Sequence, residues 1–167
     1  MELNLLCPYK VVVDNSGLIY KFNTKNDILY KITFSKASSY FSDSPYVNQL
    51  GEVFSLSIEK VSSEREPFDA EVRKTIDSIL QHFFLDTQKS LLYVCDTLDK
   101  KEYKRLMKFN KWYFDSRYKD NVAKMEEAVT DQDGITYYST LLFHNQNPFR
   151  LQLFQAHLDF IDSLRNK

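Results

Sequence analysis

Glycine is scarce in this chain, which has only 3 glycines among 167 residues. Loops that cradle phosphate groups use backbone N–H groups from several glycines placed close together. Gly17, Gly51 and Gly134 are far apart in the sequence, and no GxSxG, HExxH or CxxC motif occurs. The sequence therefore predicts no cofactor and no metal site, and it favours a protein that is not an enzyme.

Cysteine and long apolar runs are also scarce. Cys7 and Cys95 are the only cysteines, too few and too far apart for a disulfide framework or a zinc site. No segment approaches the roughly 20 apolar residues of a membrane helix, and the first residues lack the pattern of a secretory signal. Two free thiols suit a reducing compartment, so we expect a cytoplasmic protein that does not bind membranes.

The residues that are present predict one α+β domain over residues 1–167. Hydrophobic residues make up 43% of the chain and aromatic residues 15%, which is enough for a packed core. Alternating apolar residues predict strands, and apolar residues at helical spacing predict three helices that start near Asp69, Asp99 and Asn147. The predicted strands cover residues 9–14, 18–22, 28–34, 52–61, 91–95, 122–129 and 135–143.

The order of these elements, βββ(β)-α-β-α-ββ-α, predicts a mixed, mainly antiparallel sheet of about six to seven strands. The strand, helix and strand between residues 52 and 95 predict one parallel pair, joined by a crossover. The rest of the sheet is expected to be antiparallel, with helices on at least one face.

Charge is distributed unevenly, although the chain as a whole carries a net charge of only −1. Residues 100–119 carry eight basic and two acidic side chains, a local net charge of +6. The flanking residues 62–99 and 120–167 are acidic on balance. The basic segment is therefore the most unusual surface that the sequence predicts.

The basic segment also contains six aromatic residues, and it allows two interpretations. Basic groups neutralise phosphates and aromatic rings stack on bases, as in proteins that bind single-stranded nucleic acids. The helical spacing instead favours a buried stripe of Tyr103, Leu106, Met107 and Asn110 or Trp112. The lysines would then form a solvated face, namely Lys101, Lys104, Lys108 and Lys111.

A cluster of polar residues follows the buried strand at 91–95. Asp96 ends this strand and Asp99 follows it, and ligands often bind at the carboxyl ends of parallel strands. The alternative is structural: the two aspartates cap the next helix, with Asp99 and Glu102 spaced as in a capping box, and Cys95 packs as a small apolar side chain. The candidate residues for a ligand or partner site are Cys95, Asp96, Asp99, Lys101, Lys104, Arg105, Lys108 and Trp112.

Three segments resemble a family of uncharacterised proteins from Bacteroidetes, labelled domain of unknown function 6169. The segments are FSLSIEKV, PFDAEVRKTIDSILQHFF and LLYVCDTLDKKEYKRLMKFNKWY, and the third is the most specific. The resemblance covers nearly the full length. It implies a bacterial cytosolic protein, and it transfers no activity or site residue.

The order of elements is also similar to that of the acyl-CoA N-acetyltransferase (GNAT) superfamily. Those enzymes hold the pyrophosphate of coenzyme A with a glycine-rich loop, whereas this chain has SSEREP at residues 62–67. Two glutamates and a proline replace the phosphate-binding amides there. The similarity therefore implies a GNAT-like fold without coenzyme A binding.

These observations leave the function unknown, with three alternatives open. The first is a non-enzymatic binding or accessory protein that acts through a protein partner or by self-association. The second is a protein that binds nucleic acids or nucleotides through residues 100–119. The third is a degenerate GNAT-like acyltransferase.

Overall fold

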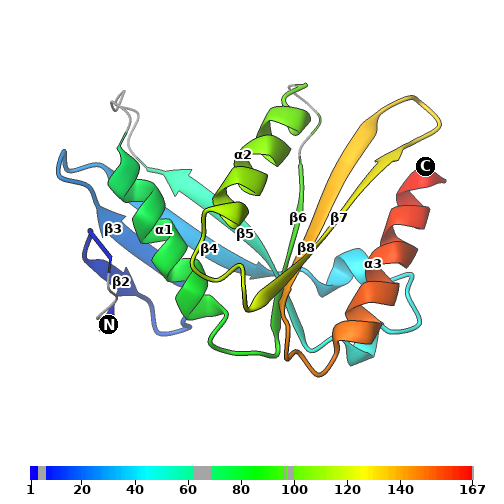
Figure 1. The fold of residues 1–167 in the computed structure, drawn as a ribbon, viewed down its shortest axis with the longest axis horizontal. Helices are drawn as coiled ribbons and strands as arrows, with labels where there is room; N and C mark the ends of the chain where they lie inside the picture. Colours follow the sequence, from blue (N-terminus) through cyan, green and yellow to red (C-terminus); the bar gives the residue numbers. More distant parts are fainter. Residues whose placement is uncertain (4–6, 62–68, 96, 98–99, 167) are drawn as a thin grey trace. The chain divides into compact units, whose positions relative to one another are not determined.

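The alternating segments form strands and the helically spaced segments form helices in the computed structural model of the chain (Figure 1). The structure describes residues 1–3, 7–61, 69–95, 97 and 100–166. The described chain contains a mixed, mainly antiparallel sheet and three α-helices, so the predicted α+β class and element order are confirmed. Within these residues, no helix is long and apolar enough to cross a lipid bilayer.

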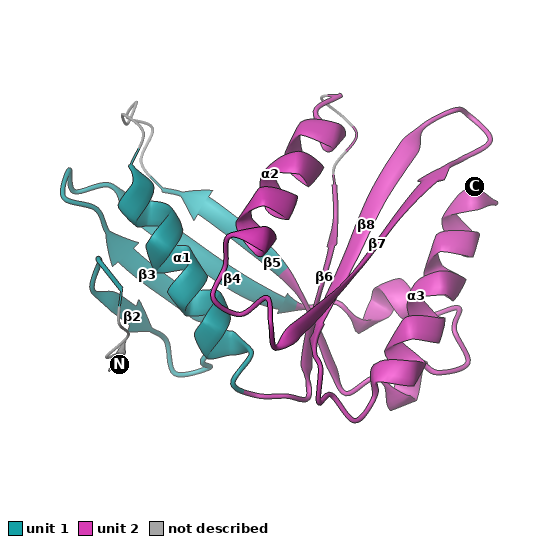
Figure 2. Cartoon of the chain, viewed as in Figure 1, with its two compact units in different colours: residues 1–35, 56–85 teal, residues 36–55, 86–167 magenta. Residues whose placement is uncertain are grey.

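The described chain divides into two compact units, which are coloured separately in Figure 2. Unit 1 comprises residues 1–35 and 56–85, and unit 2 comprises residues 36–55 and 86–167. The strand β5 (Glu52–Lys60) contributes its first residues to unit 2 and its last residues to unit 1. The expectation of a single folding domain stays a prediction.

Unit 1 is an antiparallel meander with one helix on it. The strands follow chain order, β1 (Glu2–Leu3), β2 (Val11–Val13), β3 (Ile19–Asn23), β4 (Leu29–Lys36) and the end of β5. The two-residue strand β1 is an addition to the predicted set. The helix α1 (Ala70–Phe83) begins where predicted, because the Asp69 carboxylate accepts a hydrogen bond from the Glu71 backbone N–H at 2.9 Å.

Aromatic side chains hold α1 against the meander of unit 1. The ring of Phe34 stacks on that of Phe83, with 4.2 Å between the ring centroids. The Tyr20 hydroxyl lies 3.2 Å from Nδ1 of His82, and the rings of Tyr20 and Phe34 meet edge to face. Since side chains alternate along a strand, these contacts place Tyr20, Phe22, Ile32 and Phe34 on the face that α1 covers.

Unit 2 contains the other two α-helices and the parallel pair. Its strand order is β5-β6-β8-β7, in which β5 and β6 run parallel as predicted and the other pairs are antiparallel. The crossover expected between residues 52 and 95 is thus present. The remaining elements are two short 3₁₀ helices, β6 (Lys89–Val94), α2 (Glu102–Phe114), β7 (Val122–Thr130), β8 (Thr136–His144) and α3 (Arg150–Arg165).

The helices α2 and α3 lie on opposite sides of strands β6, β8 and β7 (Figure 1). The side facing α3 is the apolar core of unit 2, and it includes Leu141 and Phe143 of β8 with Leu153 and Phe160 of α3. The helix α3 follows Asn147, as expected, and one side of it is buried along its length, namely Leu153, His157, Phe160, Ile161 and Leu164.

A histidine is fully buried in this core. The Oγ of Ser139 and Nε2 of His157 are 2.9 Å apart, and Nδ1 of His157 is buried with no hydrogen-bond partner among the described residues. Burial lowers the pKa of His157 to about 4, because the surrounding apolar side chains disfavour the charged form.

We predict that unit 2 loses stability in mild acid through His157. Below pH 6.5 the unfolded chain binds a proton that the folded chain does not bind until about pH 4. The free energy of unfolding should therefore fall by about 3 kcal/mol across this window. Urea denaturation from pH 7.5 to 4.5 measures it. His157→Gln should show a shallower slope than the wild type and than His144→Gln, and equal slopes would contradict the prediction.

Candidate site around helix α2

One buried side chain and a ring of half-buried groups hold α2 on the sheet of unit 2. Leu106 is the buried residue of this helix. The Phe109 ring lies 4.8 Å from the Tyr93 ring of β6, and the Tyr113 hydroxyl donates a 2.6 Å hydrogen bond to the carbonyl oxygen of Val122. These contacts fix which side of α2 faces the strands.

Polar side chains from β7 complete the layer beneath α2. The ammonium group of Lys124 donates to Oδ1 of Asn110 and forms a 2.5 Å ion pair with Glu126, and its side chain is only 11% exposed. The same ammonium lies 5.5 Å from the centroid of the Phe114 ring, a cation–π contact. Lys124 therefore ties the C-terminal half of α2 to the sheet.

Cys95 lies near the N-terminal half of α2 and is buried, with 3% of the residue's surface exposed. Burial raises the pKa of the Cys95 thiol, and the nearby Arg105 guanidinium acts in the opposite direction. In the first turn of α2, the Glu102 oxygen Oε2 is buried without a hydrogen-bond partner among the described residues. Arg105, Glu102 and Glu126 all lie close enough to Cys95 to affect the pKa of its thiol.

The structure places the other predicted site residues as follows. Lys101, Lys104 and Lys108 are exposed. Trp112 is half-buried, with Lys108 Nζ 4.9 Å from its ring centroid and Phe109 edge-on at 5.9 Å. Asp96 and Asp99 lie outside the described residues. Whether the eight residues act as one site stays a prediction.

The expected capping box at residues 99–102 is wrong. The helix begins at Glu102 with Lys101 as its N-cap, and the Lys101 side chain makes no capping hydrogen bond. Lys100 has a φ of +54°, a left-handed conformation that ends the preceding segment just before the helix starts. Glu102 therefore occupies the first position of the helix, where its charge suits the helix dipole.

The predicted buried stripe of α2 is also wrong at two positions. Tyr103 is 58% exposed and Met107 is 51% exposed. Both lie about 60–100° around the helix from Leu106, which faces the sheet, so helical geometry turns them to one flank. Phe114, at 61% exposed, extends this flank toward the end of the helix.

The exposed part of α2 thus combines a cationic row with an apolar flank. We call it the α2 surface, defined by two sets of exposed residues: the lysines 101, 104, 108 and 111, and the apolar residues Tyr103, Met107 and Phe114.

The sequence did not indicate the contributions of Tyr93, Lys124 and Glu126. No motif contains them, and their one signal is the alternation that places Lys124 and Glu126 on the same face of a strand. In the part of the chain that the structure describes, no three His, Cys, Asp or Glu side chains gather in a group that could hold a metal ion.

Comparison with known families supports the resemblance found in the sequence. Residues 68–158, more than half of the chain, match the family described as "Family of unknown function (DUF6169)". The chain belongs to this family. The matched DUF6169 segment includes all of α2, β6, β7 and β8, so the α2 surface lies within it. A search of curated proteins finds no match.

The burial of Cys95 predicts that the two thiols of this DUF6169 chain differ in reactivity. The thiolate is the reactive form, and burial both shields Cys95 and raises its pKa, whereas Cys7 is half-buried. Iodoacetamide at pH 8 should label Cys7 first and label Cys95 only after urea unfolding, as mass spectrometry of peptides would show. Equal labelling of both thiols in the folded chain would contradict the placement of Cys95.

Proposed function

We propose that this chain is a non-enzymatic binding protein of the bacterial cytosol, and that its α2 surface docks an acidic protein partner. The observation that carries the proposal is the apolar flank of α2. Tyr103, Met107 and Phe114 are each more than half exposed on the same helix. Large apolar side chains grouped on a surface mark interaction sites more often than scattered ones do.

The composition of the α2 surface matches that of a protein interface. Aromatic residues and methionine are enriched at the centre of interfaces, and charged groups lie at the rim. Here Tyr103 and Met107 would contact the partner, and Lys104 and Lys111 would lie beside them. Since the basic charge is concentrated in this segment, complementary charge favours an acidic partner and raises the rate of association.

Charge reversal on α2 tests this proposal. The partner would be identified by affinity capture from the native host, and its Kd measured with purified proteins. Lys104→Glu/Lys108→Glu should weaken binding about tenfold or more, mainly through slower association. Both lysines are exposed, so the fold should not change.

The matched control is Lys25→Glu/Lys36→Glu, which makes the same change in net charge at exposed lysines outside α2. This control should bind within about twofold of the wild type. Equal losses in the two double variants would show that net charge, rather than the α2 surface, governs the interaction.

Single-stranded nucleic acid is a second candidate ligand for the same surface. Two exposed rings, Tyr103 and Phe114, beside lysines are the observation that favours it. A labelled oligothymidine of 20 nucleotides at about 50 mM salt is the direct probe. Tight binding that falls steeply with salt and is lost in Tyr103→Ala would favour this candidate over a protein partner.

The relation to GNAT enzymes stays a proposal about fold. The parallel strands β5 and β6, with α1 between them in the chain, are consistent with that architecture. Residues 62–67, where the sequence departs from the glycine-rich loop of those enzymes, lie outside the described residues. Coenzyme A binding is therefore not part of the proposed function.

A further inference from the structure

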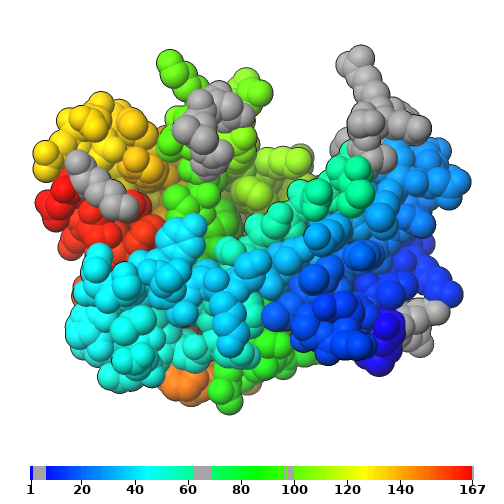
Figure 3. All heavy atoms as spheres, turned by 180° about the vertical axis from the view of Figure 1, so that it is seen from behind, coloured from blue at the N-terminus to red at the C-terminus, as the bar shows by residue number. Residues whose placement is uncertain are grey.

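In unit 1, strands β2, β3 and β4 have one face covered by α1 and one face open. The covered face carries Tyr20, Phe22 and Phe34, as described above. The next residues along the strands point the other way, and Figure 3 shows the blue N-terminal strands facing the viewer with no helix over them. The open face carries Lys10, Val12 and Lys21, all of which are exposed.

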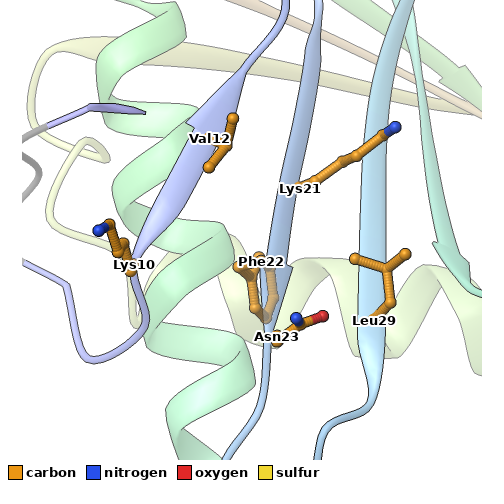
Figure 4. A pocket seen from close by; sticks show the side chains of 6 residues that line it. All are labelled: Lys10, Val12, Lys21, Phe22, Asn23 and Leu29. Atoms are coloured by element: carbon orange, nitrogen blue, oxygen red, sulfur yellow. The ribbon is translucent and has the colours of Figure 1, made fainter. Parts of the chain in front are cut away.

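A hollow of about 460 Å³ lies on this open face. It is lined on the open face by residues of three neighbouring strand segments, Lys10, Val12, Lys21, Asn23 and Leu29. Phe22 of β3 also borders it, although its side chain is buried on the covered face. Figure 4 shows Lys10 and Val12 on one side of β3 and Leu29 on the other, with the Asn23 amide near Leu29 and the ammonium group of Lys21 pointing away from Lys10. The hollow therefore combines an apolar floor with cationic margins and an amide.

The strand register places two lysines side by side next to this hollow. Lys21 of β3 and Lys31 of β4 are direct cross-strand partners, and like charges in this arrangement destabilise a sheet. Lys31 has a carboxylate 3.9 Å away, that of Glu59. No described carboxylate forms an ion pair with Lys21, so part of the repulsion is not neutralised within the described chain.

We propose that this hollow binds a small organic anion that has an apolar body and a phosphate, sulfonate or carboxylate head. The head would lie by Lys21, where it offsets the repulsion from Lys31. The body would lie on Val12 and Leu29, and the Asn23 amide would supply a hydrogen-bond donor. The volume is within the range of small-molecule sites. The site lies in unit 1 and does not depend on the α2 surface.

The probe for this site is 1-anilinonaphthalene-8-sulfonate, an apolar anion of suitable size, followed by NMR on the ¹⁵N-labelled chain. We expect the largest shifts at the amides of Val12, Lys21 and Asn23. The neutral analogue N-phenyl-1-naphthylamine should bind about tenfold more weakly, because it lacks the charge. Largest shifts at α2 or another distant segment, or equal binding of the neutral analogue, would overturn the proposal.

A lysine variant separates loss of the site from loss of the fold. Lys21→Gln should weaken binding of the probe about tenfold. The same change should raise the melting temperature of the free protein by about 1 °C, because it removes a like-charge pair. Lys36→Gln, at an exposed lysine outside the hollow, should change neither value. Binding to Lys21→Gln with wild-type affinity would overturn the proposal.

Discussion

Side-chain alternation along β8 determines what each helix of unit 2 contacts. Leu141 and Phe143 point to one side and join the apolar core beneath α3. Tyr138 points to the other side, where its ring meets that of Tyr103 on α2. Because the first side is apolar and closely packed, α3 is a structural helix. The second side is mixed, so α2 is held by one leucine, aromatic contacts and the hydrogen bonds of Lys124.

This difference explains why α2 has an exposed side that a partner could contact, whereas the main role of α3 is to fill the core. The helix α2 buries only Leu106 fully, and the side away from the sheet is in contact with solvent. Exposure to water costs the lysines of α2 little free energy, whereas it costs more for Tyr103, Met107 and Phe114. Their exposure is the least favourable feature of the helix, and a docked partner would remove it.

The sequence predicted those parts of the fold that local patterns determine. The start of α1 at Asp69, the helix that follows Asn147 and the parallel pair each follow from residues close together in the chain or from the order of elements. The exposure of Tyr103 and Met107 could not be predicted, because helical spacing shows which residues share a face but not how closely the sheet approaches it. The Lys21 and Lys31 pair also depends on strand register, which alternation alone leaves open.

The sequence likewise indicated some residues of the two candidate sites and not others. Arg105 and the exposed lysines were named as candidates because they lie in the basic segment at residues 100–119, and Cys95 because it ends the buried strand at 91–95. Lys124 and Glu126 were missed because they reach α2 from a strand that is distant in sequence and carries no motif. The hollow on unit 1 was missed because it consists of ordinary strand residues brought together by pairing.

The proposed contact of the α2 surface is with a partner protein in the cell. Its most direct test is a photoreactive benzoylphenylalanine in place of Met107, in the full chain expressed in its native host. Leu151 of α3, which is 74% exposed, is the control position. We expect a discrete crosslinked protein at position 107 that is lost with Lys104→Glu/Lys108→Glu and absent at position 151. No crosslink at 107, or the same crosslinks at both positions, would contradict it.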